Sequence, residues 1–204
     1  MSGRYIAFEG IDGAGKSTVA EAVAEALRSD DRNVVTVREP GGTPVGEAIR
    51  EILLHSHDDM APWTEALLFA ASRAQLAAQT VAPLLEAGAW VLSDRTVYSS
   101  LAYQGGGRGL GIDIVRTVND AGLDGVWPDL VVVLEVDPET GLEREEDPDR
   151  IGKEGIELQA RVAASYRQMA ETDPRIVFVD GSGTVAEVVR DAVAVIRERF
   201  VESV

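Results

Sequence analysis

Short apolar runs alternate with amphipathic stretches along the whole chain. The apolar runs, rich in Val, Ile, Leu and Ala, predict strands at residues 4–10, 33–39, 89–95, 129–136 and 175–181. Several runs are apolar at nearly every position, which is typical of strands buried on both faces of a parallel sheet. Stretches with helical spacing of apolar residues predict helices at residues 16–29, 44–55, about 62–88, 112–122, 153–172 and 184–200.

The order of these elements predicts an α/β fold, a five-stranded parallel sheet flanked by helices on both faces. No repeat, low-complexity tract or linker divides the 204 residues, so we expect one domain, residues 1–204. Right-handed crossovers bring the loops that follow the strands to one edge of the sheet, and ligands bind at that edge in such folds.

The composition indicates the cellular compartment in which we expect the chain to work. Hydrophobic residues make up 45% and charged residues 26% of the sequence, which is ordinary for a soluble globular protein. No run approaches the roughly 18 apolar residues of a membrane span, and the first residues lack the pattern of a secretory signal. The absence of cysteine excludes disulfides and thiolate metal sites. These features predict a cytoplasmic protein with no membrane partner.

The net charge of −16 is the most unusual property of the composition. An acidic surface repels the phosphates of DNA and RNA, so we expect no nucleic-acid partner. All basic residues except Lys16 and Lys153 are arginine. A GC-rich genome would explain that preference, but it would not explain 35 acidic residues against 19 basic ones. The acid excess favours a halophilic protein, as a hypothesis, because carboxylates keep a surface hydrated while salt screens their repulsion.

The stretch GIDGAGKS, residues 10–17, carries the clearest chemical signal. It matches G-x-x-x-x-G-K-[ST] and stands between a predicted strand and a predicted helix. Glycines let backbone N–H groups converge on phosphate oxygens, the lysine adds a mobile cation, and the hydroxyl can ligate Mg²⁺. We expect this loop to bind ATP through Gly10, Ile11, Asp12, Gly13, Ala14, Gly15, Lys16, Ser17 and Thr18.

A phosphate-binding loop occurs in several classes of protein, and the rest of the chain separates them. A GTPase would carry an N-K-x-D guanine-reading motif, and neither lysine is so placed. A motor or large ATPase would require further domains, for which 204 residues leave no room. The size fits a kinase that phosphorylates a small acceptor.

Three further segments near predicted strand ends supply residues for an acceptor pocket. Residues 37–50 contain Arg38, Glu39 and Arg50, and residues 66–75 place Phe69 and Arg73 on one helix face. Residues 93–111 contain Asp94-Arg95 and, further along, Ser100, Tyr103 and Gln104. Taken singly, these residues also fit an ordinary amphipathic helix or a local ion pair. Their combination in one order favours a binding site.

In this order and spacing the segments resemble the thymidylate kinase family, which converts dTMP to dTDP with ATP and Mg²⁺ on a P-loop NTPase fold. The resemblance covers nearly the whole chain, and its motifs are the P-loop together with REPGGT, LLFAASRAQ, DRTVYSSLAYQG, PDLVVVLEV and VDGSG. It implies a homodimer. REPGGT and AYQG discriminate more sharply than the P-loop, which many families share.

The resemblance implies a role for each acceptor residue. Phe69 would stack on thymine, Arg73 would bind its exocyclic oxygen, and Ser100 with Gln104 would read the ring edge. Tyr103 would lie against the 2′ position of the sugar.

The same resemblance assigns the polar contacts around the sugar and the phosphate. Asp12 would contact the 3′-hydroxyl, and Arg95, with Arg38 and Arg50 nearby, would bind the acceptor phosphate.

The catalytic cations are divided between the loop and a lid. Lys16 and Arg95 would act with Mg²⁺, which Ser17 would ligate and Asp94 would contact or orient. Some family members carry an arginine in the P-loop, where this chain has Gly13. The lid, about residues 141–155, would then supply the missing cation, and its candidates are Arg144, Arg150 and Lys153. A charged, solvated connector is the alternative interpretation.

Two other segments and two other functions stay open. Residues 55–59, HSHDD, have metal-ligand residue types but read as a surface loop, and residues 104–111 read as a flexible connector. A kinase of the same fold for another acceptor, such as a deoxynucleoside or dUMP, is the first alternative function. A non-catalytic P-loop module that binds nucleotide is the second.

Overall fold

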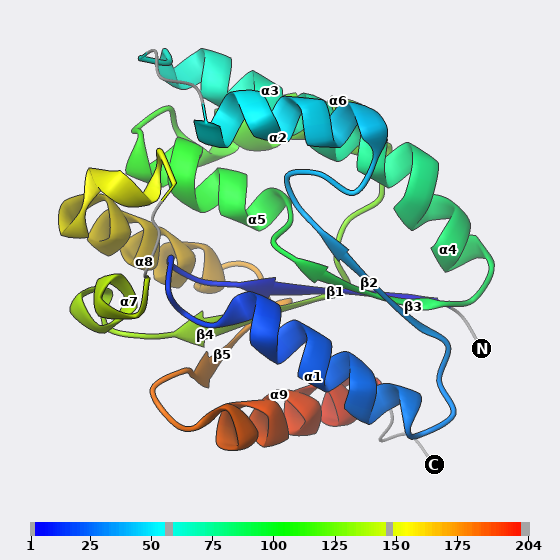
Figure 1. The fold of residues 1–204 in the computed structure, drawn as a ribbon. Helices are drawn as coiled ribbons and strands as arrows, with labels where there is room; N and C mark the ends of the chain where they lie inside the picture. Colours follow the sequence, from blue (N-terminus) through cyan, green and yellow to red (C-terminus); the bar gives the residue numbers. More distant parts are fainter. Residues whose placement is uncertain (1–2, 56–58, 146–148, 201–204) are drawn as a thin grey trace.

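A computed structural model describes residues 3–55, 59–145 and 149–200 of the chain. Its centre is an all-parallel, five-stranded sheet with the strand order β2-β3-β1-β4-β5 (Figure 1). The strands are β1 (Arg4–Glu9), β2 (Val34–Arg38), β3 (Trp90–Asp94), β4 (Leu130–Glu135) and β5 (Ile176–Asp180). Each strand lies inside a run predicted from the sequence, so the five-stranded parallel sheet is confirmed.

Helical segments connect the strands. They are α1 (Lys16–Arg28), α2 (Pro44–His55), α3 (Pro62–Leu76), η1 (Ala77–Val81), α4 (Ala82–Glu86), α5 (Val97–Ser100), η2 (Leu101–Gly107), α6 (Ile112–Leu123), α7 (Pro138–Arg144), η3 (Gly152–Glu154), α8 (Ile156–Ala170) and α9 (Val185–Phe200). Among the described residues, none of these helices has the length and hydropathy needed to cross a membrane.

Three predictions on helical segments were wrong. The single helix expected at about 62–88 is interrupted by the π-helical turn η1, because Pro83 has no N–H to continue an α-helical ladder. The helix expected at 153–172 begins three residues later, because Gly155 adopts a left-handed φ of 81°. Residues 104–111 are not simply a connector, since they begin in the π-helical η2. Gly106 lies so close to α8 that an added Cβ would be 1.8 Å from Ser165 Oγ.

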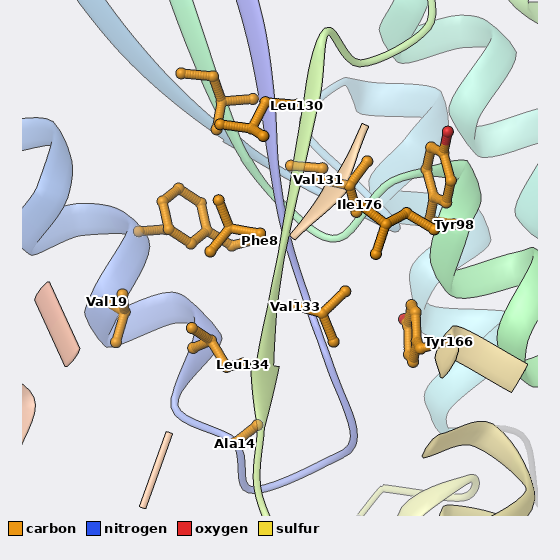
Figure 2. Close-up of a cluster of buried hydrophobic side chains, with 14 of the residues drawn as sticks. Phe8, Ala14, Val19, Tyr98, Leu130, Val131, Val133, Leu134, Tyr166 and Ile176 are labelled. Carbon is orange, nitrogen blue, oxygen red and sulfur yellow. The ribbon is translucent and has the colours of Figure 1, made fainter. Parts of the chain in front are cut away.

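The sheet is covered on both faces, as the sequence predicted. Helices α1 and α9 lie on one face, and α3, α5, α6 and α8 lie on the other (Figure 1). Strand β4 contributes side chains to the packing on both faces of the sheet, because alternate residues of a strand point in opposite directions. Leu130 and Leu134 point toward α1, whereas Val131 and Val133 point toward the layer that contains Tyr166 of α8 (Figure 2). The continuous apolar run of this strand is therefore explained by burial on both sides.

Strand order positions the site. β1 lies between β3 and β4, and Phe8 is in register with Asp94. The P-loop that follows β1 and the Asp94-Arg95 turn that follows β3 therefore leave the sheet side by side, at its carboxyl edge. Ligand sites of open parallel sheets occur at this position.

Candidate active site

A cavity of about 620 Å³ opens at the carboxyl edge of the sheet. It lies where the P-loop, the segment after β2, the turn after β3 and helix α3 meet the end of α7. The sequence-predicted residues that line it are Asp12, Gly13, Gly15, Lys16, Ser17, Thr18, Arg38, Glu39, Arg50, Phe69, Asp94, Arg95, Ser100, Tyr103, Gln104 and Arg144. Gly10, Ile11 and Ala14 belong to the P-loop but not to this lining, and neither do Arg73 and Arg150.

The P-loop presents its backbone to the cavity. Gly13 and Gly15 adopt positive φ values of 73° and 83°, which only glycine reaches without strain. Gly15 also caps the N-terminus of α1, whose partial positive charge favours an anion. Lys16 is buried, and its Nζ donates to the carbonyl of Ile11 at 2.6 Å. Burial lowers the pKa of Lys16 to about 8, and the nearby Arg95 charge acts in the same direction.

Position 13 requires glycine, because the lid lies very close to the P-loop there. A Cβ added at Gly13 would lie 1.9 Å from the carbonyl oxygen of Gly141 in α7. A Cβ added at Gly141 would in turn lie 2.6 Å from the carbonyl oxygen of Asp12. The two glycines let α7 pack directly on the loop, and this arrangement leaves no room for an arginine at position 13.

Ser17 and Asp94 form the pair that the sequence predicted for a metal. Ser17 Oγ donates to Asp94 Oδ2, and Asp94 Oδ1 is buried without a partner among the described residues. Hydroxyl and carboxylate oxygens fit a hard divalent cation such as Mg²⁺. The described part of the chain contains no cluster of three or more His, Cys, Asp or Glu residues that would hold a metal alone. A cation bound here would therefore take its other ligands from water and from phosphate.

Arg95 reaches from the turn after β3 to the P-loop. Its backbone adopts a left-handed φ of 69°, which is uncommon for a residue with a side chain. The guanidinium donates to the Gly10 carbonyl at 3.3 Å and to Asp12, and it lies 5.2 Å from the centre of the Tyr103 ring. Burial opposes ionisation of Asp12, but the Arg95 and Lys16 charges outweigh it, so the pKa of Asp12 lies below its usual value.

Glu9 holds the strained turn in place, and sequence analysis missed it. Its carboxylate is fully buried and accepts from Thr96 N at 2.7 Å, Thr96 Oγ1 at 2.7 Å, Ser99 Oγ at 2.6 Å and Tyr166 Oη at 2.7 Å. Thr96 directly follows Arg95, so these bonds tie the turn to the end of β1. The signal in the sequence was an acidic residue at the end of an otherwise apolar strand.

Arg38 and Arg50 bring positive charge to the acceptor side. Arg38 pairs with Glu47 at 3.0 Å, and Arg50 donates to the carbonyl of Pro40 at 2.9 Å. Burial, and after it the neighbouring Arg38 charge, lower the pKa of Arg50. Two arginines that line one cavity suit a phosphate, whose charge both can share.

Four further lining residues carry the groups that a pocket for a flat ring would need. Phe69 and Tyr103 supply aromatic surface, and Ser100 and Gln104 supply polar groups. Ser100 Oγ is buried and has no hydrogen-bond partner among the described residues. An unpaired buried hydroxyl is costly, so this atom fits the polar edge of a bound base.

Arg73 lies outside the cavity lining. It is buried, and its guanidinium donates to Glu39 at 2.6 Å, to Asn119 at 2.5 Å and to the Thr96 carbonyl at 3.2 Å. Burial raises the pKa of Glu39 to about 7, although the Arg73 charge partly offsets the effect. Arg73 therefore supports residues of the pocket, and its expected contact with a base oxygen stays a prediction.

The two lid arginines point in different directions. Arg144 lines the cavity and donates to the carbonyls of Gly181 at 3.0 Å and Ser182 at 3.4 Å. Arg150 is not part of the lining, and it donates to the carbonyl of Leu53 at 2.9 Å and to Glu65 at 2.6 Å. The catalytic roles of both stay predictions.

Two expected segments lie partly outside the described residues. Positions 146–148 of the lid and 56–58 of HSHDD are not described, and Lys153 lies in η3. Of the two histidines, His55 is exposed and pairs with Glu51 at 3.2 Å.

Comparison with known proteins identifies the family of the chain. The thymidylate kinase family model matches residues 8–192. The thymidylate kinase of Halothermothrix orenii is 45% identical over 197 residues, covering 94% of this chain and 95% of the relative. That of Enterococcus faecalis is 44% identical over 211 residues and covers 100% of both chains. Because these matches extend far beyond the P-loop, the chain belongs to the thymidylate kinase family.

Proposed function

We propose that the chain, acting as one domain, transfers the γ-phosphate of ATP to dTMP and releases dTDP and ADP. The observation that supports this most is that one cavity contains both a glycine-built anion loop and an arginine-lined pocket with aromatic walls. Phosphoryl transfer between two nucleotides requires both sites to meet at their phosphate ends. The family to which the chain belongs supports dTMP as the acceptor.

Transfer would depend on alignment and charge neutralisation rather than on a strong base. The attacking oxygen of dTMP is already anionic, so no group has to remove a proton from it. Lys16 would exchange the Ile11 carbonyl for the β- and γ-phosphates. Arg95 would turn from Asp12 to the acceptor phosphate, which would free the Asp12 carboxylate for the 3′-hydroxyl of the sugar. Arg144 is the lid cation that already lines the cavity.

Mg²⁺ is the cofactor proposed for the donor side. When bound, it would neutralise charge on the β- and γ-phosphates and hold them in one geometry. Ser17 and Asp94 would hold it, because they meet in the cavity and Asp94 Oδ1 has an unused lone pair among the described residues.

We also propose a homodimer, for which the exposed apolar residues on three adjacent helices are the support. Helix α3 packs against both α2 and α6 (Figure 1). Val45 on α2, Leu67 on α3 and Ile114 on α6 are 52%, 53% and 56% exposed. Light scattering at micromolar protein concentration measures the mass, and a monomer would contradict this part of the proposal.

An acceptor panel tests the function. The purified chain is incubated with ATP and Mg²⁺ and with dTMP, dUMP or thymidine, at low and at multimolar KCl. We expect dTDP from dTMP to be the fastest product. Faster phosphorylation of thymidine or dUMP would favour the other-acceptor alternative, and ATP binding without product at any salt concentration would favour a non-catalytic module. Activity that peaks at low KCl, with unfolding at high KCl, would contradict the proposed halophilic character.

A further inference from the structure

Glu65 occupies a position that neither the motifs nor the cavity lining would single out. It lies in the first turn of α3, four residues before Phe69, and its side chain is 1% exposed. Its carboxylate accepts from Gln104 Nε2 at 2.9 Å, from Arg108 at 2.8 and 3.0 Å, and from Arg150 at 2.6 Å. One carboxylate therefore joins the ring pocket, η2 and the lid.

The charge state of Glu65 follows from these contacts. Burial alone would favour the protonated form, but the hydrogen bonds from Arg108, Arg150 and Gln104 outweigh it, so the pKa of Glu65 is lowered. Glu65 is therefore an ionised carboxylate at neutral pH, and an ionised carboxylate only accepts hydrogen bonds.

This fixes the orientation of the Gln104 amide. Because Glu65 offers no donor, the Nε2 of Gln104 must face it, whichever way the amide would otherwise rotate. The Oε1 then faces away from Glu65. Gln104 lines the cavity, and among the described residues its Oε1 accepts no hydrogen bond.

We propose that Glu65 is a positioning residue for base specificity: it binds the amide nitrogen of Gln104 and thereby presents the amide oxygen to the acceptor base. The inference rests on the proposed function. The pocket would then offer a hydrogen-bond acceptor to the ring N–H of a thymine-type base. A cytosine-type base has a lone pair at the same ring position and would be repelled. A desolvated polar group that meets a mismatched partner discriminates strongly.

A purely structural role for Glu65 is the competing explanation, because the carboxylate also anchors the lid through Arg150. The two explanations differ in what they change. Loss of the lid anchor should slow all acceptors alike. Loss of the amide orientation should change the preference between acceptors, and only when Gln104 is present.

The experiment measures kcat/KM for dTMP and dCMP with ATP and Mg²⁺ in four proteins. They are the wild type, Glu65→Gln, Gln104→Met and the double variant. The amide introduced by Glu65→Gln can donate to Gln104 Oε1 and allow the Gln104 amide to turn. We therefore expect this variant to reduce the preference for dTMP over dCMP about tenfold or more. In the Gln104→Met background the Glu65→Gln change should leave the preference unaltered. Arg150→Met is the control for the lid contact, and it should slow both acceptors and keep their ratio.

Three results would overturn the inference. The first is an unchanged preference for dTMP over dCMP in Glu65→Gln. The second is a change in this preference on Glu65→Gln that is equally large with and without Gln104. The third is an equally large change in this preference in Arg150→Met. A wild type that makes no dTDP would instead refute the proposed function. If Glu65→Gln does not fold, a structure of the wild type with dTMP decides. The inference requires N3 of the base within hydrogen-bond distance of Gln104 Oε1, and N3 beyond its reach would refute it.

Discussion

The donor and acceptor sides of the cavity are built in different ways. The proposed donor side is a continuous loop, residues 10–18, which would bind mainly through its backbone and glycine conformations, with Lys16 as its one cation. The acceptor side takes side chains from several elements, and buried partners hold them. Glu39 is held by Arg73, Gln104 by Glu65, and the Arg95 turn by Glu9.

This difference determines where each side is vulnerable. A backbone site is lost when a glycine or the single cation is changed, because little else contributes. A side-chain site depends on charges that have been removed from water, and each is tolerable only while its partner is present. Substitutions on the donor side should therefore reduce turnover, whereas substitutions behind the acceptor side should reduce stability and acceptor affinity together.

Lys16→Ala gives the largest expected effect. Turnover should fall on the order of a thousandfold, because the proposed role of the lysine is to stabilise charge on the transferred phosphoryl group. Binding of dTMP should survive, since no acceptor residue is changed. Steady-state kinetics and calorimetric titration with dTMP measure the two quantities. A parallel loss of dTMP affinity would mean that the two sides are not independent.

Arg73→Met tests the acceptor scaffold. The substitution removes the cation that lowers the pKa of Glu39, which burial has already raised to about 7. At pH 8 folding would then have to protonate this group, and we expect a loss of about 3 kcal/mol in the free energy of unfolding at that pH. The KM for dTMP should rise, and the KM for ATP should change little. Chemical denaturation with kinetics on the same samples measures both. The double variant Arg73→Met/Glu39→Gln is the control, because it removes both charges and should recover part of the stability. No recovery would show that the charge pair is not the cause.

The sequence pattern predicted the sheet well, because a strand buried on both faces has a continuous run of apolar residues. The continuous apolar run at 129–136 is strand β4, and its residues pack against both helical layers. The interruption at 77–81 was not predicted, because a single proline in an otherwise helical pattern does not reveal which hydrogen-bonding pattern replaces the α-helix. The spacing of apolar residues indicates which face of a helix is buried. It does not indicate whether a turn is α-helical or π-helical.

The two sides of the cavity also differ in how well they could be predicted from the sequence. The P-loop was readable from consecutive residues, because its chemistry is local. Glu9 and Glu65 were missed, since their partners lie 87 or more and 39 or more residues away in the sequence. Arg73 and Arg150 were assigned to bound nucleotides, and these roles stay predictions; in the structure both donate to buried or partly buried protein acceptors. Sequence shows which charged residues exist, but it does not show which of them have already been paired by the fold.

The pH dependence of kcat/KM should differ between the two sides of the cavity, and this is the next largest expected effect. Only the cationic form of Lys16 attracts phosphate, and burial has lowered its pKa to about 8 in the free protein. The value of kcat/KM for ATP should therefore fall about tenfold for each pH unit above 8. The acceptor-side cations are arginines, which stay charged in this range, so kcat/KM for dTMP at saturating ATP should stay level. Lys16→Arg should be slower but should lose the limb above pH 8. The same limb in both wild-type profiles would contradict the assignment.

The smallest effect concerns the support of α5, which carries Ser100. Tyr98 of α5 donates to Asp173 at 2.5 Å, and Arg175 pairs with the same carboxylate at 2.7 Å. Burial would raise the pKa of Asp173, but these contacts outweigh it and lower the pKa to about 2. Because the folded-state pKa lies below the unfolded value near 3.8, the stabilisation is complete above pH 4 and is lost as the pH falls toward 2. Arg175 is partly exposed, so solvent screening limits the contribution to about 1 kcal/mol. Asp173→Asn should remove this part of the acid sensitivity in denaturation curves between pH 4 and 2, and an unchanged slope would show that Asp173 does not anchor α5 through its charge.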